Sequence, residues 1–343
     1  MGIEDINQIL KERVPHAFTY IPLRSFQGHA IAIDAACWLF ANKSGALKDA
    51  LQRTTDAVGG VDQGLIIAGL TDAVIRFLAR LMASNITPIW ILDGETRPEK
   101  KAAQERRTSA KGKIKDKIET EKTRLLSLHP LERVSADAEF RRLLLNNIFV
   151  TKEEIMTISS IVASMGVPVI VAPHDAEALG SVLALEKKVA AVWTTDTDVY
   201  LFGIPIAIKG FAGYVGGEQQ VEVVLPSLAI QGLGMSMAEF VDLCIILQCD
   251  FNVRMKGNGK AFALKIIEEH RSIEAGMSAY PTKPWDDLCH IRCRQIFTPF
   301  PSSIPTTSLR LDKTRLEAFN AIRMDRDLAQ AFHHLPDPQP SPW

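Results

Sequence analysis

Short apolar runs alternate along the chain with longer segments in which apolar residues recur every three or four positions. The short runs are rich in β-branched residues and predict strands that are buried on both faces of a sheet. These predicted strands are 30–34, 88–93, 168–172 and 189–194. The longer segments predict helices, chiefly 63–84, 151–165 and 175–186. Strands that alternate with helices favour an α/β fold, with a mostly parallel central sheet flanked by helices.

Acidic residues stand where these strands end or where the next helix starts. They are Asp34, Asp93, Asp175, Glu177, Asp196 and Asp198, joined by Asp250 after a further apolar segment. The carboxyl ends of neighbouring parallel strands meet in one crevice, so we expect the seven side chains to converge. One such residue alone is usually a helix cap or half of a salt bridge. Seven together need cations, because an unpaired buried carboxylate is very costly.

The chemistry of this cluster favours Mg²⁺, or Mn²⁺ in its place, because all the ligands are oxygen atoms. Zinc prefers His and Cys, and none of the eight histidines and five cysteines shows a zinc-binding spacing. Two hard cations about 4 Å apart would activate a water molecule and stabilise the leaving oxygen of a phosphodiester. The sequence therefore predicts a two-metal site that cleaves phosphodiester bonds.

Composition indicates the size of the core and the compartment in which this chemistry would take place. With 343 residues, of which 47% are hydrophobic, the chain can bury a sizeable core in one large domain or two closely packed ones. No apolar run reaches the length of a membrane span, no signal peptide is visible, and Ile6 breaks the myristoylation pattern. The odd number of scattered cysteines fits a reducing compartment. We expect a soluble intracellular protein with no membrane partner.

A net charge of −1 conceals a basic segment between Arg97 and Arg124. This segment holds eleven Lys or Arg residues against five acidic ones. Such a stretch is often only a solvated helix with salt bridges on its surface. Its start four residues after Asp93 and its few apolar residues favour the other interpretation, a surface that attracts a nucleic-acid strand.

These motifs resemble those of the flap endonucleases and their XPG-type relatives, which are structure-specific 5′ nucleases. The similarity covers about residues 1–300. It begins with Met-Gly-Ile and continues through the segments IAIDAACWLF, Asp93-Gly94, VTKEEIMTISSIVASMGVPVIVAPHDAEA, TTDTDVYLFG and FVDLCIILQCDFNVRMKGNGKAFALKIIEEH. The motif D-x-E-A, followed by T-x-D-x-D, is too specific to arise easily by accident.

The resemblance implies a PIN-like nuclease core and a C-terminal extension, 301–343, with Pro-rich ends. The parts of the core would be an N-terminal nuclease region (1–96), a helical arch (97–148), an internal nuclease region (149–235) and a helix–hairpin–helix-like DNA-binding region (236–300). In this family a single-stranded 5′ end passes through the arch.

The resemblance also implies roles for single residues. Lys100 and Arg107 match the positions whose basic side chains reach the scissile phosphate, and Asp93 and Asp198 complete the expected catalytic set. Phe40 matches an aromatic residue that stacks on a base beside the cut. The alternative is that Phe40 is an ordinary core aromatic on a buried helix.

The duplex part of the substrate is expected to lie against 238–270, which reads as helix, turn and helix. Two glycines in the turn allow close approach to a phosphate, and the next helix start presents free N–H groups. The family often binds K⁺ at this turn, here at about 250–260, although its usually apolar middle position is Asn258 in this chain. The expected DNA-binding residues are Gly2, Phe40, Arg254, Lys256, Gly257, Gly259, Lys260 and Lys265.

The chain departs from the family pattern at one residue and in two segments. Asp175 stands where the family usually has Glu, which is one methylene longer, so we expect Asp175 to reach a metal through a water molecule. The segment 41–62 has little resemblance to the family and is expected to form a loop beside the duplex. The C-terminal extension surrounds a helical stretch at 313–332 and lacks a sliding-clamp-binding peptide, so no sliding-clamp partner is supported.

These inferences favour a Mg²⁺-dependent nuclease that cuts branched DNA at 5′ flaps and at single-strand/double-strand junctions, in replication, repair or recombination. It would act at sites of DNA metabolism, in the nucleus or its equivalent. Two alternatives stay open: a 5′–3′ exonuclease of double-stranded DNA from the same superfamily, and a catalytically weak protein that binds DNA junctions. The intact carboxylates, with Lys100 and Arg107, favour an enzyme over a binding protein.

Overall fold

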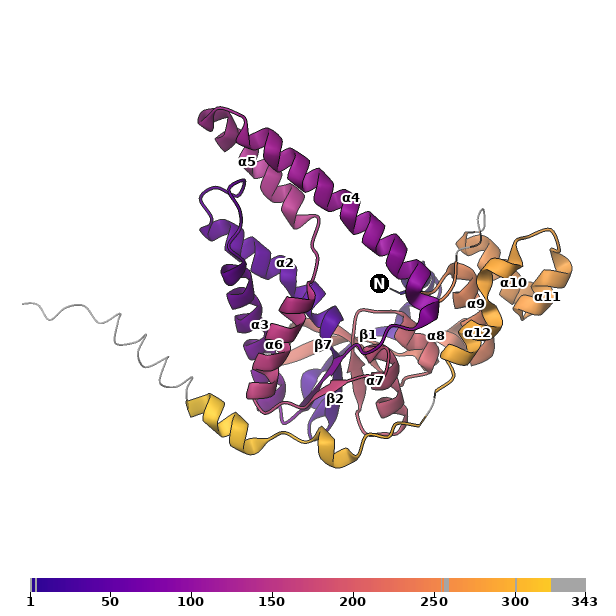
Figure 1. Ribbon diagram of the computed structural model, residues 1–343. Helices are drawn as coiled ribbons and strands as arrows, with labels where there is room; N and C mark the ends of the chain where they lie inside the picture. The colour runs from indigo at the N-terminus through magenta and orange to yellow at the C-terminus, as the bar shows by residue number, and fades with distance from the viewer. Residues whose placement is uncertain (1, 4, 254, 256–258, 300, 322–343) are drawn as a thin grey trace, which may run out of the picture.

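Seven strands form one sheet in the computed structural model, which describes every residue except 1, 4, 254, 256–258, 300 and 322–343 (Figure 1). The strands are β1 (Phe18–Pro22), β2 (Ala30–Asp34), β3 (Thr87–Leu92), β4 (Val169–Val171), β5 (Ala191–Trp193), β6 (Ala207–Val215) and β7 (Glu218–Val224). Their order in the sheet is β1-β7-β6-β5-β2-β3-β4. β2 to β6 run parallel, whereas β7 is antiparallel to both of its neighbours. The expected mostly parallel sheet is confirmed.

Helices cover both faces of the sheet, because successive residues of each strand point to opposite sides. In β2, Ile31 and Ile33 belong to one buried core, and Ala32 between them belongs to the other. The first core packs against α2 (Ala35–Arg53), α3 (Gln63–Ala83) and α6 (Lys152–Ser164). The second core packs against α1 (Ile6–Arg13), α7 (Ala176–Leu185) and α9 (Met237–Leu247).

All four predicted strands and the three chief predicted helices are present, with ends displaced by at most two residues. The strands β1, β6 and β7 were not predicted, because their sequences lack a continuous apolar run. The expectation of a loop over 41–62 was wrong for its first part, since α2 continues to Arg53. This part of α2 buries Ala46, Leu47, Ala50 and Leu51, which recur at helical spacing.

The basic segment rises away from the sheet as a helical arm (Figure 1). It consists of the 3₁₀ turn η3 (Pro98–Lys100), the long helix α4 (Lys101–Leu126) and the return helix α5 (Pro130–Leu145). The break expected near His129-Pro130 separates α4 from α5. Among the described residues of α4, only Ala103 and Leu125 are buried, so most of the helix faces solvent. Arg141 of α5 donates to the carbonyls of Leu51 and Thr54 (2.8 Å for Thr54) and thereby ties the arm to the end of α2.

A group of short helices stands beside the second core (Figure 1). It contains α8 (Pro226–Gly232), α9, α10 (Lys260–His270), α11 (Ile273–Ala279) and α12 (His290–Ile296). The expected helices on both sides of the hairpin are therefore present as α9 and α10, whereas Arg254, Lys256, Gly257 and Asn258 lie outside the described residues. The remaining 3₁₀ turns are η1 (Pro15–Ala17), η2 (Leu23–Phe26), η4 (Asp198–Phe202), η5 (Trp285–Leu288) and η6 (Thr306–Leu309).

The described part of the C-terminal extension crosses back toward α6. Residues 313–321 are helical, which confirms the start of the predicted helix 313–332, and the rest of that helix lies outside the described residues. The N–H of Asp312 donates to the carbonyl of Gly166 (2.8 Å). Within the described ranges, no single helix combines the length and apolar character needed to cross a membrane. Only α8 and α9 taken together reach that length and composition, and this pair is bent by 91°.

Candidate active site

Acidic residues gather at the carboxyl ends of four adjacent strands. In sheet order, they are Asp196 and Asp198 after β5, Asp34 at the end of β2, Asp93 after β3, and Asp175 and Glu177 after β4. Asp250 follows the end of α9. The chain runs from β2 outward to β3 and β4 on one side, and β5 and β6 lie on the other side of β2. The acids therefore surround a topological switch point, where open α/β sheets bind their ligands.

Hydrogen bonds near these strand ends hold two of the carboxylates in place. Asp34 accepts hydrogen bonds from the backbone N–H of Cys37 and from the hydroxyl of Thr194, each at 3.0 Å. Asp93 accepts from the backbone N–H of Ala176 (2.9 Å), which links the end of β3 to the start of α7. These bonds orient the side chains without adding a positive charge.

Asp198 is fully buried, and no hydrogen-bond donor among the described residues reaches either of its carboxylate oxygens. Burial, then the like charges of Asp196 and Asp250, raises the pKa of Asp198 well above its ordinary value. A buried carboxylate with two unpartnered oxygens is unfavourable unless a cation approaches it.

The same imbalance extends through the cluster. Burial, then the like charge of Asp93, raises the pKa of Asp34 to about 6. Burial also raises the pKa of Asp93 and of Glu177, although the ammonium group of Lys100 opposes both shifts. The cluster thus carries more negative charge than the described side chains around it neutralise.

Three cations from the base of the arm already face the cluster. Lys100 Nζ lies 2.6 Å from Asp175 Oδ1 and 3.1 Å from Glu177 Oε1. Arg107 Nη2 lies 2.5 Å from Asp250 Oδ1. Arg97, which is not among the predicted site residues, donates its Nε–H to Asp175 Oδ2 at 3.0 Å. Its only sequence signal is its position in the basic segment, three residues before Lys100.

The residues present fit hard divalent cations, although they do not stand ready to coordinate one. Within the described ranges, no group of three or more Asp, Glu, His or Cys side chains is arranged as a metal site. Lys100, Arg97 and Arg107 form ion pairs with three of these carboxylates, Asp175, Glu177 and Asp250. The donors are all carboxylate oxygens, and both oxygens of Asp198 lack a partner, which suits Mg²⁺ or Mn²⁺ better than a softer metal. Two divalent ions and these three side chains would balance all seven negative charges.

The N-terminal residues lie against the same cluster. The backbone N–H of Ile3 donates to the hydroxyl of Thr197 (2.7 Å). Gly2 has a φ of 87°, and a Cβ atom there would come within 2.2 Å of Asp196 Oδ1. Only glycine fits such a left-handed position packed against the carboxylate. Gly2 is therefore part of the wall of the site, next to Asp196, and its expected contact with DNA stays a prediction.

On α2, Trp38 faces the core and Phe40 faces solvent. Phe40 is 46% exposed, so the alternative that it is a core aromatic was wrong. Trp38 is only 3% exposed and packs against Phe77 and Trp90, with ring centroids 5.4 and 5.5 Å away. An exposed ring six residues after Asp34 is available for stacking.

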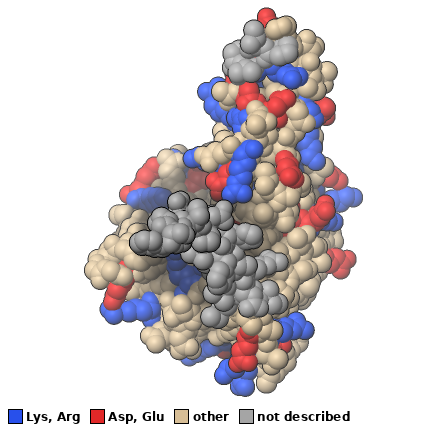
Figure 2. Space-filling model, turned by 90° about the vertical axis from the view of Figure 1, so that its left-hand side faces the viewer, with Lys and Arg blue, Asp and Glu red and all other residues tan. Residues whose placement is uncertain are grey.

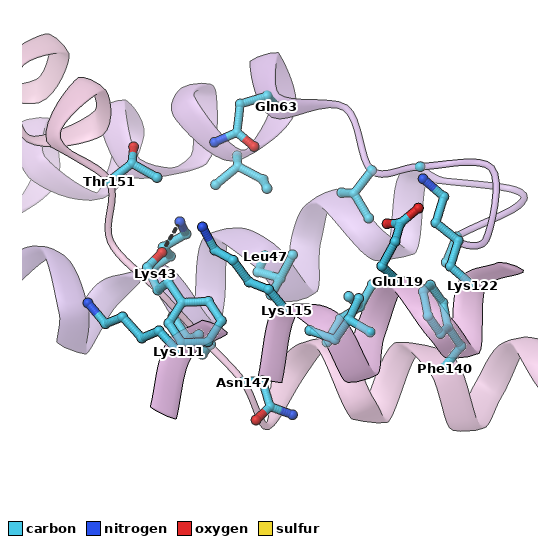
Figure 3. Close-up of a pocket in the computed structure, with 18 of the residues that line it drawn as sticks. Lys43, Leu47, Gln63, Lys111, Lys115, Glu119, Lys122, Phe140, Asn147 and Thr151 are labelled. Atoms are coloured by element: carbon cyan, nitrogen blue, oxygen red, sulfur yellow. Dashed lines mark hydrogen bonds between the residues drawn. The ribbon is translucent and has the colours of Figure 1, made fainter. Parts of the chain in front are cut away.

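A cavity of about 780 Å³ lies between the arm and the α2–α3 pair. In Figure 3, Lys115, Glu119 and Lys122 extend from α4 into this cavity. Lys111 also lines it, and Phe140 and Asn147 form part of its wall on the α5 side. Figure 2 shows Lys and Arg side chains interspersed with acidic ones along the protruding arm. The cavity is thus a mixed but mainly basic surface with apolar walls.

The expected duplex-binding residues that the structure describes lie on α10 or directly before it. Gly259 is the residue before α10, and no atom of the described residues lies within 4 Å of a Cβ atom built there, which leaves room for a ligand on the described side. Lys260 Nζ lies 3.2 Å from a carboxylate oxygen of Glu12, and Lys265 is exposed beside the ring of Tyr280. The contribution of the rest of the turn stays a prediction.

Comparison with known proteins agrees with this site. The XPG N-terminal domain matches residues 1–114, and the XPG I-region matches residues 166–250. Flap endonuclease 1 from Tetrahymena thermophila is 30% identical over 277 residues, which cover 80% of this chain and 67% of that protein. Flap endonuclease 1 from Saccharomyces cerevisiae (strain ATCC 204508 / S288c) is 30% identical over 275 residues, with the same coverage of each protein.

Solved structures share the fold at lower sequence identity. The catalytic core of Rad2 in complex with DNA substrate (complex IV) superposes with a TM-score of 0.58 at 18% identity, over 90% of each chain. Flap endonuclease-1 from Methanococcus jannaschii superposes with a TM-score of 0.54 at 20% identity, over 88% of this chain and 89% of that one. With the matched domains and the similarity to the two curated enzymes, the chain belongs to the XPG-type flap endonuclease family.

Proposed function

We propose that this protein is a Mg²⁺-dependent, structure-specific 5′ nuclease. Its substrate is branched DNA, and it hydrolyses a phosphodiester bond at a 5′ flap or at a junction of single and double strands. Family membership supports the reaction, and the acidic cluster at the switch point supports the choice of metal. This activity would serve DNA replication, repair or recombination.

One observation carries the proposal most directly. Asp198 buries two unpartnered carboxylate oxygens at the centre of an all-oxygen cluster, and cationic side chains of the arm face the same cluster. A structural role for Asp198 would require a donor or a counter-ion at those oxygens, and the described residues supply none. A bound divalent cation supplies what the residue lacks.

The residues that would hold two Mg²⁺ ions are Asp34, Asp93, Asp175, Glu177, Asp196, Asp198 and Asp250. When bound, such ions supply an activated water and neutralise charge on the leaving oxygen. Lys100 and Arg107 would exchange their carboxylate partners for the scissile phosphate. Two fixed cations there stabilise the charge that develops in the transition state.

The surfaces around the cluster would position the two parts of the DNA. The exposed ring of Phe40 is available to stack on the base beside the scissile bond. The single-stranded 5′ end would pass beneath α4, along the cavity lined by Lys111, Lys115 and Lys122 (Figure 3). The duplex would lie against the α9–α10 region, where Lys260 and Lys265 contact phosphates without reading sequence.

A single assay tests the proposal against its alternatives. The protein is incubated with end-labelled 5′ flap, nicked duplex and blunt duplex, each with and without Mg²⁺. We expect cleavage of the flap near its junction in Mg²⁺ only. Faster degradation of nicked and blunt duplex would instead favour a 5′–3′ exonuclease. Tight flap binding without any cleavage in Mg²⁺ or Mn²⁺ would favour a junction-binding protein.

A further inference from the structure

The wall of the cavity beneath α4 carries an aromatic ring that neither hydrophobic core of the described residues contains. Ile148 and Val150 pack against the first core, whereas Phe149 between them lines the cavity and is only partly buried. Phe140 also lines the cavity, but it is 3% exposed and belongs to the first core. Phe149 therefore offers a ring to the cavity that core packing does not explain.

The backbone of Phe149 is held in place by the body of the molecule. Its carbonyl accepts a hydrogen bond from the ammonium group of Lys43, which is itself paired with the buried carboxylate of Glu154 at 2.6 Å. Two residues after Phe149, the hydroxyl of Thr151 accepts the backbone N–H of Glu154 (3.1 Å) and caps α6. The ring thus starts from a fixed backbone, so a ligand that stacks on it has less freedom to remove.

Basic side chains of α4 lead from the acidic cluster to this ring. Arg107, which pairs with Asp250 of the cluster, is followed by Lys111 and Lys115 at intervals of four residues. This spacing places the three side chains on one face of α4, in steps of about 6 Å. Lys111 and Lys115 both line the cavity (Figure 3), and Lys111 Nζ lies 5.9 Å from the centre of the Phe149 ring.

The lining of the cavity fits an unpaired base better than a row of phosphates. Asp116 and Glu119 line it beside the lysines, so its charge is mixed, and its walls include the apolar Leu47 and Ile66. A phosphate would lose its hydration against such walls without gaining a partner. The flat face of a base, in contrast, stacks on an aromatic ring whatever its sequence.

Resting on the proposed nuclease function, we propose that Phe149 is a binding residue for the single-stranded 5′ end, on which one unpaired base stacks while Lys111 contacts a neighbouring phosphate. A base inside a duplex is already stacked on both faces, so this contact selects an unpaired strand. The contact is separate from that of Phe40, which lies on α2 and is expected to serve the base beside the cut.

Flaps that lack a single base test this contact without changing the charge of the DNA. A thymine 5′ flap on a duplex is prepared intact or with one abasic site, which is moved one nucleotide at a time along the flap. Each DNA is titrated with the protein in Ca²⁺ and followed by fluorescence anisotropy. For wild type, we expect losses of affinity of at least about threefold at two positions, one beside the cut for Phe40 and one further out for Phe149.

Variants of the ring assign the outer position. Phe149→Leu keeps an apolar side chain and removes the aromatic face, so it should abolish the loss at the outer position and keep the loss beside the cut. It should also bind the intact flap at least about threefold more weakly, with an unchanged affinity for plain duplex. Phe149→Trp should restore the wild-type pattern. Tyr20→Leu, the matched control, removes a 64% exposed ring on β1 outside the cavity and should behave as wild type.

The outcomes separate this inference from the proposed function. A wild-type protein that binds and cleaves 5′ flaps but tolerates an abasic site at every position beyond the cut would overturn the inference alone. If Phe149→Leu keeps the loss at the outer position, the base stacks on another residue and the role of Phe149 is overturned. A wild-type protein that binds the flap no better than plain duplex and leaves it uncleaved in Mg²⁺ would overturn both proposals.

Discussion

Asp198 is the side chain whose replacement best separates chemistry from binding. Asp198→Asn keeps the size of the residue and removes its charge. We expect this variant to lose flap cleavage in Mg²⁺, because a neutral amide is a poor ligand for a hard cation. DNA binding should stay within about threefold of wild type or tighten, since repulsion of the phosphate backbone falls. Single-turnover cleavage and gel-shift titration in Ca²⁺ measure the two effects.

The matched control is Asp72→Asn on α3, where Asp72 is 72% exposed and pairs with Arg76. It makes the same chemical change far from the cluster and should leave cleavage and binding unaltered. Substantial cleavage by Asp198→Asn in Mg²⁺ would remove Asp198 from the metal-binding set.

Arg107 allows a second test at the residue scale. Its guanidinium contacts Asp250 and is 46% exposed, so a phosphate can replace the carboxylate as its partner. We predict that Arg107→Ala lowers single-turnover cleavage at least about tenfold at saturating substrate, because a preorganised cation is lost from the transition state. Lys113→Ala should change the rate less than about threefold. Lys113 is exposed on α4 and does not line the cavity, so equal, small effects of both variants would reduce Arg107 to general attraction of DNA.

At the residue scale, the sequence predicted which residues form the site better than which side chains contact one another. Six of the acids could be predicted because they follow apolar strands, Asp250 because it follows the apolar segment that forms α9, and Lys100 and Arg107 because they match family motifs. The contact of Arg97 with Asp175 could not be predicted, because it joins residues 78 positions apart. The exposure of Phe40 also depends on tertiary packing, since Trp38, two residues earlier on the same helix, is buried.

At the scale of elements, a buried ion pair fastens the end of the arm to the body. Lys43 of α2 contacts both carboxylate oxygens of Glu154 (2.6 and 2.7 Å) and also donates to the carbonyl of Phe149. Glu154 in turn accepts from Gln63 of α3 (2.7 Å) and from the N–H of Thr151 (2.8 Å), the N-cap residue of α6. Three helices and the segment leaving α5 thus meet at one carboxylate.

We predict that Lys43→Ala lowers the free energy of unfolding by about 3–5 kcal/mol, because it leaves the 1%-exposed Glu154 as an unpaired buried charge. Chemical denaturation followed by circular dichroism measures the loss. The control is Glu139→Ala on α5, whose ion pair with Arg142 is 78% and 74% exposed. It should cost less than about 0.5 kcal/mol. Similar losses for both variants would contradict a fastening role for Lys43.

The sequence also predicted some elements of the fold better than others. Strands buried on both faces appear in the sequence as apolar runs, so β2 to β5 were predicted. β6 contains Gly210 and Gly213, and β1 and β7 lie at the antiparallel end of the sheet, so no such run marks them. Most of α4 was predictable as a solvated helix, whereas its direction over the α2–α3 pair depends on contacts of α5 with α2.

At the scale of the whole molecule, basic residues occupy two separate surfaces. Lys111, Lys115 and Lys122 line the cavity beneath α4, on the side of α2 and α3. Lys260 and Lys265 stand on α10, at the opposite end of the molecule (Figure 1). Acidic residues elsewhere offset both groups, which explains a net charge of −1 in a protein that handles DNA.

If the cavity receives the single strand and α10 the duplex, charge removal from each surface should affect different substrates. The triple change of Lys111, Lys115 and Lys122 to Ala should weaken binding of a 5′ flap and lower its salt slope by roughly two units, while plain duplex binding stays nearly unchanged. The double change of Lys260 and Lys265 to Ala should weaken flap and duplex alike, with slopes lowered by roughly one to two units. Fluorescence anisotropy in Ca²⁺ over a salt series measures all four slopes.

Total charge alone must be excluded as the cause of the flap effect. Changing Lys101, Lys113 and Lys117 to Ala removes an equal number of charges from the same helix, at positions outside the cavity beneath α4. Alanine favours a helix at least as well as lysine, so the arm should keep its shape. Because screened charges act mainly at short range, this control should lower the flap slope less than the cavity variant does. Equal slopes for the two triple variants would mean that the arm attracts DNA as a whole, and the path of the single strand through the cavity would have to be abandoned.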